Sequence, residues 1–242
     1  MKKSNALKAF TLIELLVVIT IIAILAGIAL PVYNNVTERG QQTKALAHAK
    51  QIALAMKMFA IDNDGVFPRT NVPSAAGTPA NSNQAFAALI PDYIPSETIF
   101  AVAKSEWSPT TPDNNTKRTF ESYTNTGETL EVGENHFAYV MGLNDTSNPS
   151  WPLIADGFAS GTETDPTYTS NTGEKGGVWA GKKAIVIYAD TSGTVENTVT
   201  EDDGATYYVP RKGDRTKNAF VQDTDVDNPW LSSSTEVLNP AE

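Results

Sequence analysis

A long apolar run lies close to the N-terminus of this chain. Residues 10–30 read FTLIELLVVITIIAILAGIAL and contain a single charged residue, Glu14. As a helix, a run of about 21 residues rising about 1.5 Å each spans about 30 Å, which is the thickness of the hydrocarbon core of a bilayer. The run therefore predicts a helix that crosses a membrane. Its carboxylate needs an explanation, because a charge in hydrocarbon is costly.

The charges around this run predict its orientation. Lys2, Lys3 and Lys8 precede it, and no lysine or arginine lies within it. Positive charge favours the cytoplasmic side, so the chain after Leu30 is expected on the opposite side of the membrane.

Three interpretations of the run compete. A plain transmembrane anchor leaves Glu14 unexplained. A cleaved secretory signal would use Gly27-Ile28-Ala29 as its small-residue site, but such signals have apolar runs of only about 7–15 residues. The third interpretation takes Glu14 as the main clue.

The stretch AFTLIELLVVITIIAILAGIALP, residues 9–31, resembles the N-terminus of type IV pilins and of the pseudopilins of type II secretion systems. The resemblance implies that a prepilin peptidase removes residues 1–9 as a leader, cutting between Ala9 and Phe10, and methylates the new amino group of Phe10. Glu14 then becomes the fifth residue of the mature chain. The family usually has glycine immediately before the cut, and this chain has Ala9 there.

The same resemblance supplies a role for Glu14. Cleavage would leave a positive amine on Phe10, and Glu14 lies one helical turn further on, so a carboxylate and an amine can pair within a bundle of packed helices. In the family this glutamate is associated with the terminal amine of a neighbouring subunit during fibre assembly. The alternative is a tolerated charge that reaches the membrane interface.

The sequence after the run predicts an amphipathic stem, residues 31–64. Pro31 removes a backbone hydrogen bond, so a kink or local loosening is expected near residues 27–31. Good helix formers then dominate, and Asp62-Asn63-Asp64-Gly65 followed by Pro68 predicts the end of the helix. Apolar residues at spacings of three and four define its expected buried face: Leu46, Ala49, Ala53, Met56 and Ala60, widened by Ile52 and Phe59.

Residues 65–242 form the predicted globular body. One or two short helices are expected within residues 82–103, and an exposed loop at 108–118. The strand candidates are residues 136–143, 151–158, 182–190, 193–199 and 206–210. Thr191-Ser192-Gly193 predicts a hairpin between the third and fourth of these. The result is an α+β fold of the pilin type, in which a long N-terminal helix with a membrane half and an amphipathic half packs on a small antiparallel sheet.

The body has a weaker resemblance to pilin-like proteins. One large subgroup ends in a strand, an Asp-Gly turn and a second strand, with a histidine ten positions before the aspartate. Here Asp190 matches the aspartate, but Thr191 replaces the glycine and Ala180 replaces the histidine. The chain also lacks cysteine, and therefore the disulfide that closes the C-terminal loop of many adhesive pilins. This departure favours a pseudopilin or a disulfide-free pilin.

Motifs typical of enzymes are missing from the sequence. The two histidines are His48, on the stem, and His136, which has no serine or cysteine nucleophile pattern beside it. No GxSxG, HExxH, P-loop or dinucleotide fingerprint is present. The formal charge of −10 makes nucleic acids and anionic lipid headgroups poor partners. We therefore predict a protein that is not an enzyme and has neither catalytic nor cofactor-binding residues.

One acidic segment has the spacing of a calcium loop. In QDTDVDN, residues 222–228, Asp223, Asp225 and Asp227 alternate. The segment departs from the EF-hand pattern, with Asn228 in place of glycine and Ser234 in place of glutamate. Some major pseudopilins hold their C-terminal loops with calcium, so these three aspartates are the candidate metal ligands. The alternative is a solvated acidic loop.

These observations predict a non-enzymatic fibre subunit, first inserted in the bacterial inner membrane with its body outside the cytoplasm. Its expected partners are a prepilin peptidase, the inner-membrane assembly platform, and other copies of itself and related pilins. The leading hypothesis is the pseudopilus of type II protein secretion. The alternative is a type IV pilus for adhesion, motility or DNA uptake. A hypothesis of another class is a membrane-anchored binding module or enzyme, in which residues 10–30 only tether the body.

Overall fold

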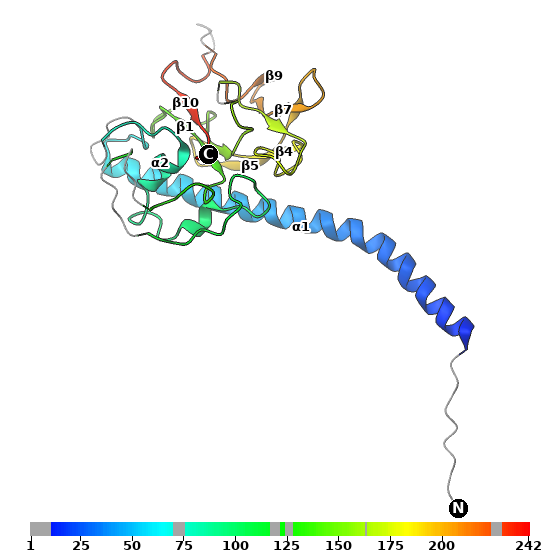
Figure 1. The fold of residues 1–242 in the computed structure, drawn as a ribbon. Helices are drawn as coiled ribbons and strands as arrows, with labels where there is room; N and C mark the ends of the chain where they lie inside the picture. The colour runs from blue at the N-terminus through cyan, green and yellow to red at the C-terminus, as the bar shows by residue number, and fades with distance from the viewer. Residues whose placement is uncertain (1–10, 70–75, 117–121, 124–127, 163, 224–228) are drawn as a thin grey trace, which may run out of the picture. The chain divides into compact units, whose positions relative to one another are not determined.

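The structure is a computed structural model, and it describes residues 11–69, 76–116, 122–123, 128–162, 164–223 and 229–242 (Figure 1). The chain divides into two compact units, the first ending at Gln41 and the second running from Gln42 to Glu242. Helix α1 (Leu12–Asp62) supplies all the described regular structure of the first unit. Its backbone remains helical through Pro31, so this proline does not end the helix.

The second unit begins with the last part of α1, whose predicted buried face is confirmed. Ala49, Ala53, Met56 and Ala60 are buried, and Leu46 is partly buried against the same core. These small and medium-sized residues let the helix lie close to the elements that it covers. Near Gly193, for example, a Cβ atom would lie 2.3 Å from Cδ1 of Ile187, 2.9 Å from Cε of Lys50 and 3.1 Å from Cδ1 of Leu46.

Helix α1 ends where the sequence predicts. Asp64 and Gly65 adopt left-handed φ angles of 54° and 80°. The Gly65 N–H then donates to the carbonyl oxygen of Ala60 at 2.8 Å, and the Asn63 side-chain amide donates to that of Phe59 at 2.8 Å. These bonds satisfy carbonyl groups that the end of a helix leaves without partners.

A five-stranded antiparallel sheet forms the centre of the body, in the order β10-β1-β2-β4-β5. In β1 and β2 every residue is buried, which is why their sequences read as apolar runs. The β4–β5 hairpin closes with Ile187 opposite Gly193, as predicted. The strands are β1 (Phe137–Met141), β2 (Pro152–Asp156), β4 (Lys183–Tyr188), β5 (Gly193–Asn197) and β10 (Glu236–Leu238).

Smaller elements complete the body. Residues 206–210, predicted as one strand, are divided between two separate sheets. The three-stranded sheet contains β3 (Tyr168–Thr169), β7 (Thr206–Tyr208) and β6 (Val199–Thr200), and the two-stranded sheet contains β8 (Pro210–Arg211) and β9 (Asp214–Asn218). The two helical pieces expected within residues 82–103 are α2 (Ser82–Ala87) and a 3-10 turn (Glu97–Phe100).

The core lies between the sheet, the last part of α1 and the segment that contains α2. Figure 1 shows α2 and the green loops that follow it beside this part of α1. Phe86 of α2 packs its ring 5.5 Å from that of Phe100 and 5.7 Å from that of Tyr139 on β1. The body thus has the predicted α+β architecture, with a helix packed on a small antiparallel sheet.

Candidate functional site

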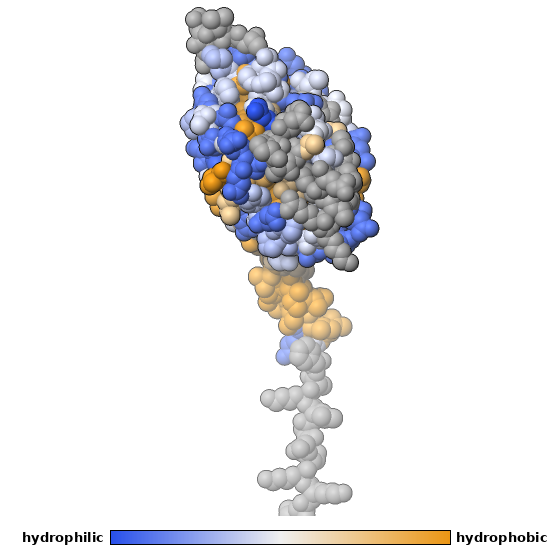
Figure 2. Space-filling model, turned by 90° about the vertical axis from the view of Figure 1, so that its left-hand side faces the viewer, coloured by the Kyte–Doolittle hydropathy of each residue, from blue (hydrophilic) through white to orange (hydrophobic). Residues whose placement is uncertain are grey.

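The surface of the N-terminal part of α1 is the most apolar feature of the molecule. Its large apolar side chains between Leu12 and Val36 are all exposed, with exposed fractions from 46% at Val18 to 81% at Leu12. Figure 2 shows a continuous orange region on this part of the molecule. A surface of this kind in a soluble protein marks a membrane or protein interaction site. In the described part of the chain, α1 is the one helix long and apolar enough to span a membrane.

Glu14 stands at the start of this helix, where it forms a capping box with Thr11. Its Oε2 atom accepts hydrogen bonds from both the backbone N–H and the hydroxyl of Thr11, each at 2.8 Å. In return, the Glu14 N–H donates to Thr11 Oγ1 at 3.3 Å. The motif satisfies N–H groups that a helix N-terminus leaves without partners, and a carboxylate is favoured at this end of the helix dipole. This capping role was not predicted from the sequence, although the spacing Thr-x-x-Glu indicates it.

The capping box uses one carboxylate oxygen of Glu14. Among the described residues, no hydrogen bond to the other oxygen, Oε1, is present. A carboxylate has lone pairs for several donors, so the cap leaves Glu14 able to accept from an ammonium group as well.

The predicted processing site lies outside the described residues. Both Ala9 and Phe10 belong to that segment, so cleavage between them and methylation of Phe10 remain predictions. The assembly role of Pro31 also remains a prediction.

Of the predicted calcium ligands, Asp225 and Asp227 also lie outside the described residues. Asp223 is described, and its Oδ2 atom lies 2.9 Å from Nη1 of Arg211 and in contact with Nζ of Lys217. Its backbone pairs with that of Trp230, with N–O distances of 2.7 and 2.9 Å. Two cationic side chains therefore neutralise Asp223, and calcium binding by this loop stays a prediction.

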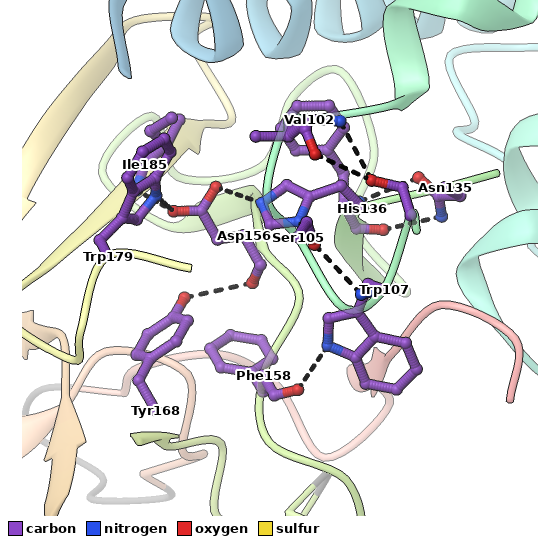
Figure 3. Close-up of polar contacts among 12 residues, drawn as sticks. Val102, Ser105, Trp107, Asn135, His136, Asp156, Phe158, Tyr168, Trp179 and Ile185 are labelled. Atoms are coloured by element: carbon purple, nitrogen blue, oxygen red, sulfur yellow. Dashed lines mark hydrogen bonds and ion pairs between the residues drawn. The ribbon is translucent and has the colours of Figure 1, made fainter. Parts of the chain in front are cut away.

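The body contains a buried polar cluster that the sequence does not indicate (Figure 3). Ser105 Oγ lies 2.6 Å from Nδ1 of His136, and Nε2 of His136 lies 2.8 Å from Oδ1 of Asp156. Ser105 lies in a loop, His136 immediately precedes β1, and Asp156 is the last residue of β2. No spacing rule connects them, and only the fold brings them together.

Every polar atom of this cluster has a partner when His136 is neutral. The Trp107 N–H donates to Ser105 Oγ at 3.1 Å, which leaves the serine hydroxyl to donate to Nδ1 of His136. The Nε2–H group then donates to Asp156 Oδ1. The other Asp156 oxygen, Oδ2, accepts from Trp179 Nε1 at 2.7 Å and from the Ile185 N–H at 2.8 Å.

The order serine, histidine, aspartate is that of a hydrolase triad, but burial argues against catalysis. His136 and Asp156 are 0% exposed and Ser105 is 3% exposed, so a substrate has no access to the hydroxyl. A nucleophile must touch its substrate to react. The cluster instead joins the loop at Ser105 to strands β1, β2 and β4.

Comparison with known proteins identifies the class of the N-terminal segment. Residues 5–30 match the family described as the prokaryotic N-terminal methylation motif. With its long N-terminal helix and small antiparallel sheet, the chain has a pilin-like fold, and its resemblance to the type IV pilin family is confirmed.

Three relatives illustrate the similarity. The type IV major fimbrial protein FimA of Dichelobacter nodosus is 37% identical over 86 residues, 33% of this chain and 54% of FimA. The type IV major pilin protein PilE1 of Neisseria gonorrhoeae is 40% identical over 74 residues, 31% of this chain and 34% of PilE1. The fimbrial protein EcpC of Eikenella corrodens is 45% identical over 76 residues, 31% of this chain and 48% of EcpC.

The matched region spans about half or less of the length of each of these relatives. No solved structure matches the chain. The similarity therefore supports the family and leaves the function of the whole protein to be argued from its own residues.

Proposed function

We propose that the protein is a structural subunit of a type IV pilus-like fibre. A single observation carries the proposal: the exposed apolar surface of α1 from Leu12 to Val36, with Glu14 as its only charge between Leu12 and Leu30. This surface suits two environments in turn, the bilayer before assembly and a bundle of identical helices afterwards. Both environments bury apolar side chains that water would leave exposed.

The proposed assembly step uses the amine that processing creates. A prepilin peptidase removes residues 1–9, and the inner-membrane assembly platform then moves the subunit from the membrane into the fibre. The carboxylate of Glu14 pairs with the terminal amine of a neighbouring copy, because an unpaired charge in an apolar bundle is costly. Only one register between neighbouring helices satisfies both charges, so the pair specifies how subunits dock.

The relatives favour a type IV pilus as the fibre. They are named as major pilins and fimbrial proteins, and this chain resembles them in its N-terminal part. The second candidate is the pseudopilus of type II secretion, which the lack of any cysteine supports. Deleting the gene separates the two: loss of surface pili supports the first fibre, and periplasmic retention of secreted proteins supports the second.

The same proposal makes the protein non-enzymatic. The Ser105–His136–Asp156 cluster is the arrangement in the described residues that most resembles a catalytic group, and it is buried. Its role in the proposal is to hold the body together.

The experiment that tests the proposal is the N-terminal sequence and intact mass of the protein from its native cell envelope. A chain that begins at Phe10 with one added methyl group supports prepilin processing. A chain that still begins at Met1 overturns the proposal and leaves a membrane-anchored module in its place.

A further inference from the structure

Three carboxylates from separate parts of the body lie close together. Glu97 begins the 3-10 turn, Asp113 lies in the loop of residues 108–116, and Glu134 lies three residues before the start of β1. One oxygen atom of each lies within 4.8 Å of one oxygen atom of each of the others. Among the described residues, no lysine or arginine forms an ion pair with any of the three.

Backbone groups hold these carboxylates in place. Glu134 accepts the Asp113 N–H at 3.0 Å with Oε1 and the Glu131 N–H at 2.8 Å with Oε2. Asp113 Oδ1 accepts the Asn115 N–H at 2.7 Å. Glu97 Oε1 accepts the Leu130 N–H at 2.9 Å. Each oxygen keeps a further lone pair, so the hydrogen bonds orient the carboxylates without using up their capacity to accept.

Glu97 provides an independent indication of a ligand. Its side chain is 0% exposed, and its Oε2 atom is buried with no hydrogen-bond partner. Burial raises the pKa of Glu97, and the neighbouring charges of Glu134 and Asp113 raise it further. A buried carboxylate oxygen without a partner is costly, and a cation placed among the three carboxylates removes that cost.

We propose that Glu97, Asp113 and Glu134 bind a divalent cation, and that this cation is calcium. All the donors are hard carboxylate oxygens, which suit calcium rather than zinc. Calcium binds oxygen ligands at about 2.3–2.6 Å in irregular geometries, so two of its ligands can lie up to about 5 Å apart. The spacing of the three oxygens fits within this limit. Asp113 is exposed, which gives the ion and its water ligands access from solvent.

The site would link segments that have little regular structure of their own. It joins the 3-10 turn at Glu97 and the loop at Asp113 to the residues that lead into β1. A chain without cysteine has no disulfide to do this. The site uses none of the residues of the segment 222–228, and it does not depend on which fibre the subunit forms.

Thermal unfolding of the full chain in detergent tests the proposal. After treatment with a chelator, the protein is titrated with CaCl2 and, in parallel, with MgCl2 at constant ionic strength. At a calcium concentration ten times Kd, we expect Tm to rise by about 3–6 °C. Extracellular calcium modules have Kd values of about 0.1–1 mM, so millimolar calcium reaches that range. Magnesium is expected to give a smaller shift, because it requires stricter octahedral geometry.

Two substitutions locate the site. Glu97→Gln is expected to abolish the calcium-dependent rise in Tm and to raise Tm in chelator, because the neutral amide relieves repulsion from Asp113 and Glu134. Asp113→Asn, at an exposed position, is expected to abolish the rise without loss of folding. Calorimetric titration measures calcium binding separately from stability, with one site expected in the unsubstituted chain and none in either variant.

Two controls make the result specific. Asp214 Oδ1 accepts the Thr216 N–H at 3.0 Å, as Asp113 Oδ1 accepts the Asn115 N–H, but Asp214 lies at the start of β9, so Asp214→Asn should keep the full calcium response. Asp223→Asn should keep it too, because Asp223 is not one of the three proposed ligands and its carboxylate pairs with Arg211 and Lys217. The proposal is overturned if calcium does not raise Tm, if Glu97→Gln and Asp113→Asn leave the rise intact, or if Asp223→Asn removes it.

Discussion

His136 Nε2 lies 2.8 Å from Asp156 Oδ1, and neither side chain is exposed. Around this pair, a serine hydroxyl, an indole and two backbone N–H groups complete a network without an unpaired member. A buried polar network contributes to stability when every group is satisfied and costs free energy when one partner is removed. The pair therefore makes the body sensitive to single substitutions at its centre.

Replacing Asp156 by alanine should strongly destabilise the body. The change leaves three donors without an acceptor, on His136, Trp179 and Ile185, in a place that water does not reach. We expect the free energy of unfolding to fall by about 3–5 kcal/mol, as for removal of one partner of a buried polar pair. Chemical denaturation of the full chain in detergent measures this loss. Asp202→Ala, at an exposed turn, is the control, and an equal loss there would contradict the special role of Asp156.

His48 should make stability fall under mildly acidic conditions. Burial lowers the pKa of His48 from its ordinary value of 6.5, and the charge of Lys44 lowers it further. Below pH 6.5 the unfolded chain therefore binds a proton that the folded chain does not, so stability is full above this pH and decreases as pH falls. Denaturation curves between pH 7 and 5 should show a smaller decrease for His48→Gln. Identical pH profiles for the two proteins would contradict the prediction.

Glu97 should give a pH dependence of the opposite sign. Because its pKa is raised from 4.5, the unfolded chain releases this proton at a lower pH than the folded chain. The contribution of Glu97 is complete below pH 4.5 and is lost as pH rises through the folded-state pKa. In calcium-free buffer, Glu97→Gln should flatten this part of the profile. Saturating calcium should flatten it in the unsubstituted chain, since the ion binds the ionised carboxylate.

The elements with strong local patterns were predictable from the sequence. The stem helix and the strands β1, β2 and β4 follow from continuous or periodic apolar residues, and β5 follows from the hairpin turn before it. The short strands β3, β9 and β10 were missed, because two to five residues carry too little pattern and β9 is largely polar. β10 pairs with β1 across almost a hundred residues of chain, and such pairing depends on tertiary packing rather than on local sequence.

The sites divide in the same way. The apolar helix and Glu14 are visible in the sequence because they are local. The clusters at His136 and at Glu97 are not visible in the sequence. Each contains at least one pair of residues that are twenty or more positions apart in the chain. The regular acidic spacing predicted Asp223 as a calcium ligand, but its carboxylate pairs with Arg211 and Lys217. The converging carboxylates at Glu97 show no such regularity.

Substitutions at the start of α1 should separate the two roles of Glu14. Glu14→Gln keeps an oxygen that can cap the helix but removes the charge that pairs with an amine, since glutamine also serves in a capping box. Thr11→Ala removes the capping partner but keeps the charge. If pairing between subunits drives assembly, Glu14→Gln should insert in the membrane and fail to form fibres, while Thr11→Ala should still assemble. Electron microscopy of sheared surface fibres, with membrane fractionation to confirm insertion, measures both. Loss of fibres in Thr11→Ala but not in Glu14→Gln would contradict the pairing role. It would assign the function of Glu14 to helix capping alone, because Thr11→Ala removes the cap and keeps the charge.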